Sequence, residues 1–160
     1  MDGVWSLLVF IGVNVVAASS GALFPPDDWY ARLRKPSWNP PNWLFAPVWS
    51  ILYLMIAVAG WLVWREAGGW AGAQTAMILY AVQLVLNAAW SGIFFGMKRI
   101  GLALAEGLAL WAAVAATMAL FFSIDPLAGW LFVPYLLWVS FAMFLTGTLL
   151  RLNRRAEAAA

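Results

Sequence analysis

The sequence predicts an all-α integral membrane protein: a bundle of five transmembrane helices in which a long first loop acts as a lid. Of the 160 residues, 65% are hydrophobic and only 10% are charged, with a mean hydropathy of +0.85. A water-soluble domain of this length could not bury so much apolar surface. The apolar residues also fall into runs of roughly 20, the length of helix that crosses about 30 Å of hydrocarbon.

The predicted spans cover about 4–24, 43–64, 72–95, 101–122 and 127–150, and we expect one domain over residues 1–160. The first run resembles a secretory signal, but it lacks a basic region before it, so we interpret it as a span. Gly, Pro and charged residues separate the runs. Only the first connection, about 25–42, is long, and long ordered loops are often functional lids.

Charge asymmetry predicts how the bundle lies in the membrane. Five spans place the first loop, the third loop and the C-terminus on one side, and that side holds Arg32, Arg34, Lys35, Lys98, Arg99, Arg151, Arg154 and Arg155. The other side holds Arg65 alone. The positive-inside rule therefore predicts that the first loop and the C-terminus are cytoplasmic. In a cell with two membranes, helical spans favour the inner one, with the outer membrane left open.

The composition also limits the chemistry. The chain has no cysteine and no histidine, which removes disulfides, thiol nucleophiles, the usual haem ligands and most zinc or copper sites. We therefore predict no metal and no cofactor. The few basic residues flank apolar segments, which is typical of membrane topology rather than of a nucleic-acid partner.

Aromatic residues gather where the first loop meets the second span. Trp38 and Trp43 are expected at the membrane interface, where indole rings are favoured. Trp49 and Tyr53 lie deeper and four residues apart, so they share a helix face. At that depth an aromatic pair is expected to pack against other helices or to bind a ligand.

The third span carries a polar and aromatic stripe. Gln83, Asn87, Trp90 and Phe94 follow one another at helical spacing. Amides are costly toward lipid, so this stripe should face the bundle interior. Two readings stay open: hydrogen bonding and packing between helices, or one wall of a ligand pocket that faces the aromatic pair of the second span.

Two smaller patterns also leave alternatives open. Ala88, Gly92 and Gly96 form a series of small residues that lets helices approach closely, either within one chain or across a homodimer. Trp138 and Ala142 share a face of the fifth span. A large ring beside a small residue could admit a planar ligand or could be ordinary packing.

Glu106 is the acidic residue that lies within a span, near the start of the fourth. An intramembrane carboxylate is a functional candidate by default. One interpretation is a hydrogen bond near the interface or to Lys98 or Arg99. The other is proton coupling in a small exporter.

Taken together, these motifs resemble the TspO/MBR family, which comprises the tryptophan-rich sensory proteins of bacteria and the mitochondrial translocator protein, once called the peripheral benzodiazepine receptor. The matching segments are Trp29-Tyr30, Lys35 to Pro41, Pro47-Val48-Trp49 with Tyr53, Gln83-Leu84 with Asn87, Trp90 and Phe94-Phe95-Gly96, and Pro134-Tyr135 with Trp138. They cover nearly the whole chain, and their combination is highly specific.

The resemblance implies a five-helix bundle, usually a homodimer, with a pocket under the first loop that binds porphyrins, sterols and benzodiazepine-type drugs. By position, the implied ligand-binding residues are Tyr30, Trp49, Tyr53, Asn87, Trp90, Phe94, Trp138 and Ala142. The family residues that match Trp49 and Trp138 are associated with light-dependent breakdown of protoporphyrin IX. The family's cholesterol motif is incomplete, because Gly147 stands where animal members have tyrosine.

Three functions follow as hypotheses. The first is a membrane receptor or sensor that binds tetrapyrroles and similar flat hydrophobic molecules and aids their transport or regulates their metabolism. Arg32, Arg34 and Lys35 would then meet acidic ligand groups, unless they serve topology alone. The second is photo-oxidative degradation of protoporphyrin IX by Trp49 and Trp138, the one enzymatic activity that the residues allow. The third is a proton-coupled exporter that uses Glu106.

Overall fold

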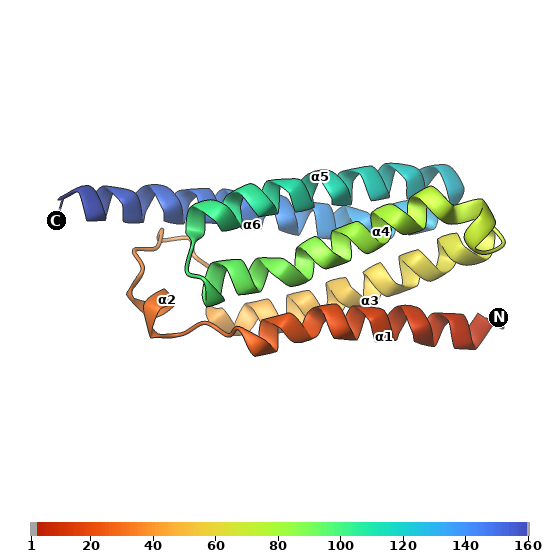
Figure 1. Ribbon diagram of the computed structural model, residues 1–160, viewed down its shortest axis with the longest axis horizontal. Coiled ribbons are helices and arrows are strands. Elements are labelled where there is room, and N and C mark those ends of the chain that lie inside the picture. Colours follow the sequence, from red (N-terminus) through yellow and green to blue (C-terminus); the bar gives the residue numbers. More distant parts are fainter. Residues whose placement is uncertain (1–2, 160) are drawn as a thin grey trace.

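The computed structural model describes residues 3–159, with side chains for residues 3–155. In chain order the elements are α1 (Gly3–Leu23), α2 (Asp28–Arg32), α3 (Asn42–Glu66), α4 (Trp70–Ser91), the π-helical turn η1 (Gly92–Gly96), α5 (Ile100–Ile124) and α6 (Pro126–Ala159). These residues form no strand. Figure 1 shows the long helices lying side by side, with the two chain ends at opposite ends of the bundle.

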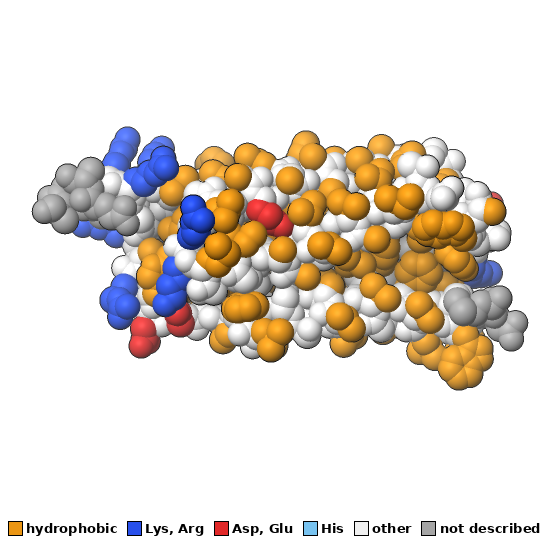
Figure 2. Space-filling model, viewed as in Figure 1, with side chains coloured by type: hydrophobic (Ala, Val, Ile, Leu, Met, Phe, Trp, Pro, Cys, Tyr) orange, Lys and Arg blue, Asp and Glu red, His pale blue; other side chains and the backbone are white. Residues whose placement is uncertain are grey.

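The five predicted spans are confirmed. The five long helices, with α4 and η1 counted as one, are long and apolar enough to cross a membrane. The protein is therefore a multi-pass integral membrane protein. Hydrophobic side chains cover the length of the bundle, and basic ones gather at the end that carries the first loop and the C-terminus (Figure 2).

The last helix is longer than predicted. We expected its span to end near residue 150 and the residues from Arg154 onward to fray. In the structure α6 continues as helix to Ala159 and extends beyond the other helices (Figure 1), while fraying of its end stays a prediction. Its final segment contains Arg, Ala and Glu, which favour helix, and neither glycine nor proline follows Gly147 to end it.

A short helix that we did not predict organises the first loop. The Asp27 side chain caps α2 by accepting a hydrogen bond of 3.1 Å from the backbone N–H of Tyr30. This bond, helped by Lys98 at 3.3 Å, lowers the pKa of Asp27 below its ordinary value. The Asp-Asp pair after two prolines is the sequence signal for this cap. The helix turns Tyr30 inward, where its side chain is buried.

The bundle is densely packed at the end away from the first loop. In the bundle as a whole, α5 lies against α4 and α6, and α1 lies against α3 and α4. Tyr80 of α4 stacks on Phe121 of α5 at 6.0 Å and contacts Phe132 of α6 at 6.4 Å. Gly60 of α3 allows this approach, because a Cβ there would lie 2.8 Å from the Tyr80 ring. The half nearer the first loop contains a second, smaller core cluster, which includes Phe94 and Leu149, and a cavity.

The third predicted span ends in a π-helical turn rather than in regular α-helix. At the end of η1, the N–H of the capping residue Met97 donates to the carbonyl of Gly92 at 2.8 Å, a bond across five residues. Phe24, which follows α1, lies against this turn, and a Cβ on Gly96 would approach its ring to 2.9 Å. Gly92 and Gly96 therefore admit a side chain of the same chain, while the predicted homodimer stays a prediction.

Candidate ligand-binding cavity

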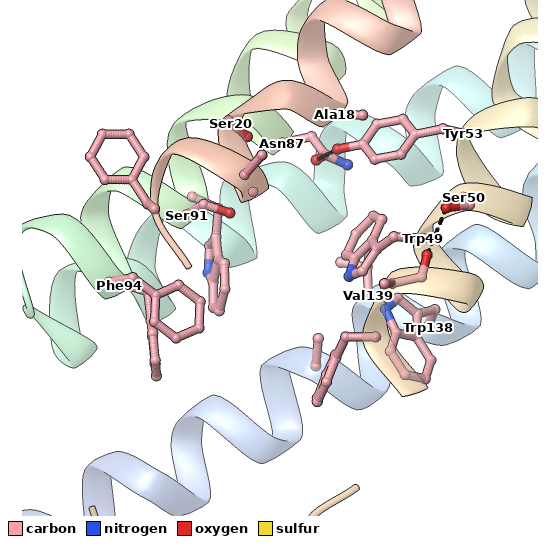
Figure 3. Close-up of a pocket in the computed structure, with 18 of the residues that line it drawn as sticks. Ala18, Ser20, Trp49, Ser50, Tyr53, Asn87, Ser91, Phe94, Trp138 and Val139 are labelled. Carbon is pink, nitrogen blue, oxygen red and sulfur yellow. Dashed lines mark hydrogen bonds between the residues drawn. The ribbon is translucent and has the colours of Figure 1, made fainter. Parts of the chain in front are cut away.

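A cavity of about 700 Å³ lies beneath the first loop, between α1, α3, α4 and α6. All of the predicted ligand-binding residues line it: Tyr30, Trp49, Tyr53, Asn87, Trp90, Phe94, Trp138 and Ala142. Figure 3 shows side chains from α3, α4 and α6 surrounding the same space. The volume is within the range of roughly 300–1,000 Å³ that is typical of pockets for drug-sized ligands.

The α3 wall is an aromatic surface. The rings of Trp49 and Tyr53 lie 5.6 Å apart, as their spacing predicted, with an angle of 35° between their planes. Trp49 also meets the ring of Tyr135 from α6 edge-on at 6.3 Å. Because Trp49 is held from two sides, its ring can present a preformed face to a flat ligand.

A chain of hydrogen bonds joins this wall to two other helices. The Tyr53 hydroxyl donates to Asn87 Oδ1 at 2.6 Å, and Asn87 Nδ2 donates to the Tyr135 hydroxyl at 2.7 Å. The Tyr135 hydroxyl in turn donates to Gln83 Oε1 at 2.7 Å. Both readings of the third-span stripe are therefore compatible with the structure, since Asn87 bonds neighbouring helices and also lines the cavity.

The α4 wall is a stack of rings. Trp90 and Phe94 lie 4.9 Å apart with nearly parallel planes, 16° from one another. Trp90 is fixed further because its Nε1 donates to the carbonyl of Ala103 on α5 at 3.1 Å. Tyr30 from the first loop meets Phe94 edge-on at 6.1 Å. Burial of Tyr30 raises the pKa of its phenol above the ordinary value.

The α6 wall combines a large ring with a small residue. Trp138 packs against Phe45 of α3 at 5.8 Å and against Phe141 at 5.5 Å, and Ala142 lies one turn further along the same face. Trp138 Nε1 is buried and makes no hydrogen bond within the described residues. Because Ala142 is small, the cavity extends into the space beside Trp138 that a larger side chain at position 142 would fill.

Sequence reasoning missed the contribution of α1. Asn14 lines the cavity and donates from Nδ2 to the Tyr80 hydroxyl at 2.7 Å and to the Phe10 carbonyl at 2.9 Å. A buried amide in a predicted span is a signal that we could have used. Other α1 residues that line the cavity, such as Ala18 and Gly21, are small and apolar, so their residue types give no sign of a binding site.

The basic residues of the first loop have different surroundings. The Lys35 ammonium donates to the carbonyls of Tyr30 at 2.6 Å and Leu33 at 3.2 Å, and it lies 4.6 Å from the centre of the Tyr30 ring. Lys35 therefore stabilises the C-terminal end of α2, where a cation is favoured. The side chains of Arg32 and Arg34 are exposed. A role for any of the three toward a ligand stays a prediction.

Glu106 does not line the cavity. Both of its carboxyl oxygens are buried on α5 and have no hydrogen-bond partner within the described residues. The predicted hydrogen bond to Lys98 or Arg99 is wrong, because Lys98 turns instead to Asp27 in the first loop. The exporter hypothesis stays a prediction that nothing at the cavity favours.

Comparison with known proteins agrees with this architecture. The family model described as TspO/MBR matches residues 6–152. A tryptophan-rich sensory protein of Cereibacter sphaeroides is 44% identical over 158 residues, which cover 98% of each chain. Protein CrtK of Rhodobacter capsulatus is 42% identical over 91% of each chain. The human translocator protein is 46% identical over 114 residues, 71% of this chain and 68% of that protein. On this match and these identities, the chain belongs to the TspO/MBR family.

Proposed function

We propose that this protein is a membrane receptor that binds a tetrapyrrole such as protoporphyrin IX, or a flat hydrophobic molecule of similar size, in the cavity beneath the first loop. The observation that carries the proposal is the convergence of aromatic rings from α3, α4 and α6 on one space of about 700 Å³. Relatives named as a sensory protein and a translocator protein fit a receptor that senses or passes on its ligand.

The energetics of such a site are favourable. A porphyrin is a broad apolar ring with acidic groups at one edge. Each well-placed aromatic pair contributes about 0.5–1.5 kcal/mol beyond burial of its surface. Several rings can therefore offset the cost of ordering the ligand and give a Kd of about 1 μM, which corresponds to roughly −8 kcal/mol.

Titration of the purified protein in the dark tests the proposal. The chain contains 12 tryptophans, and we expect protoporphyrin IX to quench their fluorescence saturably at micromolar concentration. Trp49→Leu should weaken binding about tenfold, since it removes a ring from the cavity wall. The matched control is Trp5→Leu, because Trp5 is 66% exposed and does not line the cavity. Equal affinity of the two variants would contradict the proposed site.

A second candidate is light-dependent oxidation of the bound porphyrin. It is favoured by one observation: the indole rings of both Trp49 and Trp138 line the cavity, within reach of the same ligand. Light would excite the porphyrin, and dioxygen, the oxidant that is consumed, would accept the electrons that the porphyrin loses. Each indole ring would relay an electron and be restored, so that it is not consumed.

Illumination of the aerobic complex tests this activity. We expect the porphyrin absorbance to decay more slowly in the Trp49→Phe/Trp138→Phe variant than in the parent protein, when both are saturated with ligand. Anaerobic samples serve as the control for the oxidant. An unchanged rate of decay in the double variant would rule out a role for these tryptophans and leave the receptor function standing.

A further inference from the structure

The first loop is fastened to the bundle at three places. Asp27 forms an ion pair with Lys98 of the α4–α5 connection at 3.3 Å. The backbone N–H of Arg34 donates to Asn153 Oδ1 of α6, and Asn153 Nδ2 donates back to the Arg34 carbonyl, each at 3.1 Å. The Trp38 ring stacks on a phenylalanine of α6 at 5.5 Å. The loop is thus a fixed cover over this end of the cavity.

The side of the bundle between α1 and α3 is built differently. The two helices are joined at the end away from the loop, where Trp61 Nε1 donates to the Gly3 carbonyl at 2.9 Å and Phe10 meets Trp64 at 6.2 Å. Nearer the loop, both helices line the cavity, which lies between them. Figure 3 shows Ala18 and Ser20 of α1 and Ser50 of α3 at its border.

The residues on this border face outward as well as inward. Val15 of α1 is 61% exposed and Leu54 of α3 is 57% exposed, yet both line the cavity. Further toward the loop, the exposed cavity-lining residues are small: Gly21 and Ala22 on α1, and Ala46 and Ser50 on α3. In a protein that spans the membrane, surface exposed on the side of the bundle meets lipid. The cavity therefore has an opening toward the bilayer.

We infer that the ligand enters this cavity sideways from the hydrocarbon of the bilayer, through the opening between α1 and α3, while the first loop stays in place. The inference rests on the proposed function, because it needs a ligand that binds the cavity. It also narrows the class of ligand to molecules dissolved in the membrane. The predicted lid is then a fixed cap, and the small residues of α1 and α3 form the entrance.

Closing the opening tests this route. The chain has no native cysteine, so an Ala22→Cys/Ala46→Cys variant can be linked across the opening with a short bis-maleimide after reconstitution. Protoporphyrin IX is delivered from phosphatidylcholine vesicles, and tryptophan quenching is followed by stopped flow. We expect association with this double-cysteine variant to be about tenfold slower or more after linking than before linking. An Ala22→Phe/Ala46→Phe variant, which narrows the opening without a linker and adds no tryptophan to the fluorescence signal, should also slow association.

Loosening the loop provides the matched control. Asn153→Ala removes both hydrogen bonds to Arg34 and lies outside the cavity, so we expect its association rate to equal that of the parent protein. Faster association in Asn153→Ala, together with no effect of linking or narrowing, would overturn the lateral route and favour entry past the loop. Absence of saturable quenching in the unlinked parent protein would instead contradict the proposed function itself.

Discussion

Replacing Ala142 with phenylalanine will weaken protoporphyrin IX binding by at least about 100-fold, a change of roughly 2.7 kcal/mol. Ala142 lines the cavity beside Trp138, and a phenyl ring there would occupy the space that a flat ligand needs. The added ring points into an existing void, so the fold should tolerate it better than it would tolerate overpacking of a filled core. Dark titration of the reconstituted variant by tryptophan quenching measures the effect.

The matched control is Ala112→Phe. Ala112 is exposed on α5 and does not line the cavity, so the same substitution there adds a ring that faces lipid. This variant should bind like the parent protein, and both variants should have thermal unfolding midpoints close to that of the parent. If Ala142→Phe binds protoporphyrin IX with the parent affinity and unfolds at the parent temperature, the ligand must bind elsewhere.

The bundle and most of the cavity could be predicted because the relevant residue types are distinctive: long apolar runs for the spans, and polar or aromatic residues within them for the cavity. A membrane span requires a long apolar run, and that requirement alone locates the five long helices to within a few residues, the extended end of α6 excepted. Within the spans, Asn87 and the aromatic residues stand out from an aliphatic background at helical spacing. Their sequence spacing and the family resemblance together predicted a set that the structure brings to one cavity.

The features that were missed depend on how helices meet rather than on which residues they contain. Ala18 and Gly21 of α1 line the cavity because of how α1 packs beside α3 and α4, and nothing in their residue types indicates this. Lys98 forms its ion pair with Asp27 rather than with Glu106, because the first loop places the Asp27 carboxylate beside the Lys98 ammonium. The π-helical turn at Gly92–Gly96 shifts the hydrogen bonds by one residue, for which the sequence carries no recognisable pattern.

Replacing Asn87 with leucine will lower the stability of the bundle by about 2–4 kcal/mol, because it breaks one buried and one partly buried hydrogen bond and leaves polar groups without partners. The Tyr53 hydroxyl loses its acceptor, and the Tyr135 hydroxyl loses a donor while keeping its bond to Gln83. Leucine has the same number and branching of side-chain heavy atoms, and the cavity beside position 87 has room for its larger methyl groups, so the loss of stability reflects the hydrogen bonds more than the packing. Thermal unfolding in detergent measures this change as a lower midpoint.

A double-mutant cycle with Tyr53→Phe separates the network from simple packing. If Tyr53 and Asn87 act as a pair, Tyr53→Phe removes the hydroxyl that Asn87→Leu leaves without an acceptor. The loss of unfolding free energy in the double variant should therefore be about 1 kcal/mol smaller than the sum of the losses in the two single variants. Additive costs would mean that the 2.6 Å bond between them contributes nothing to stability. Trp49 packs against the rings of Tyr53 and Tyr135. A coupled hydrogen-bond network would therefore also imply that the aromatic wall is preorganised in the ligand-free protein.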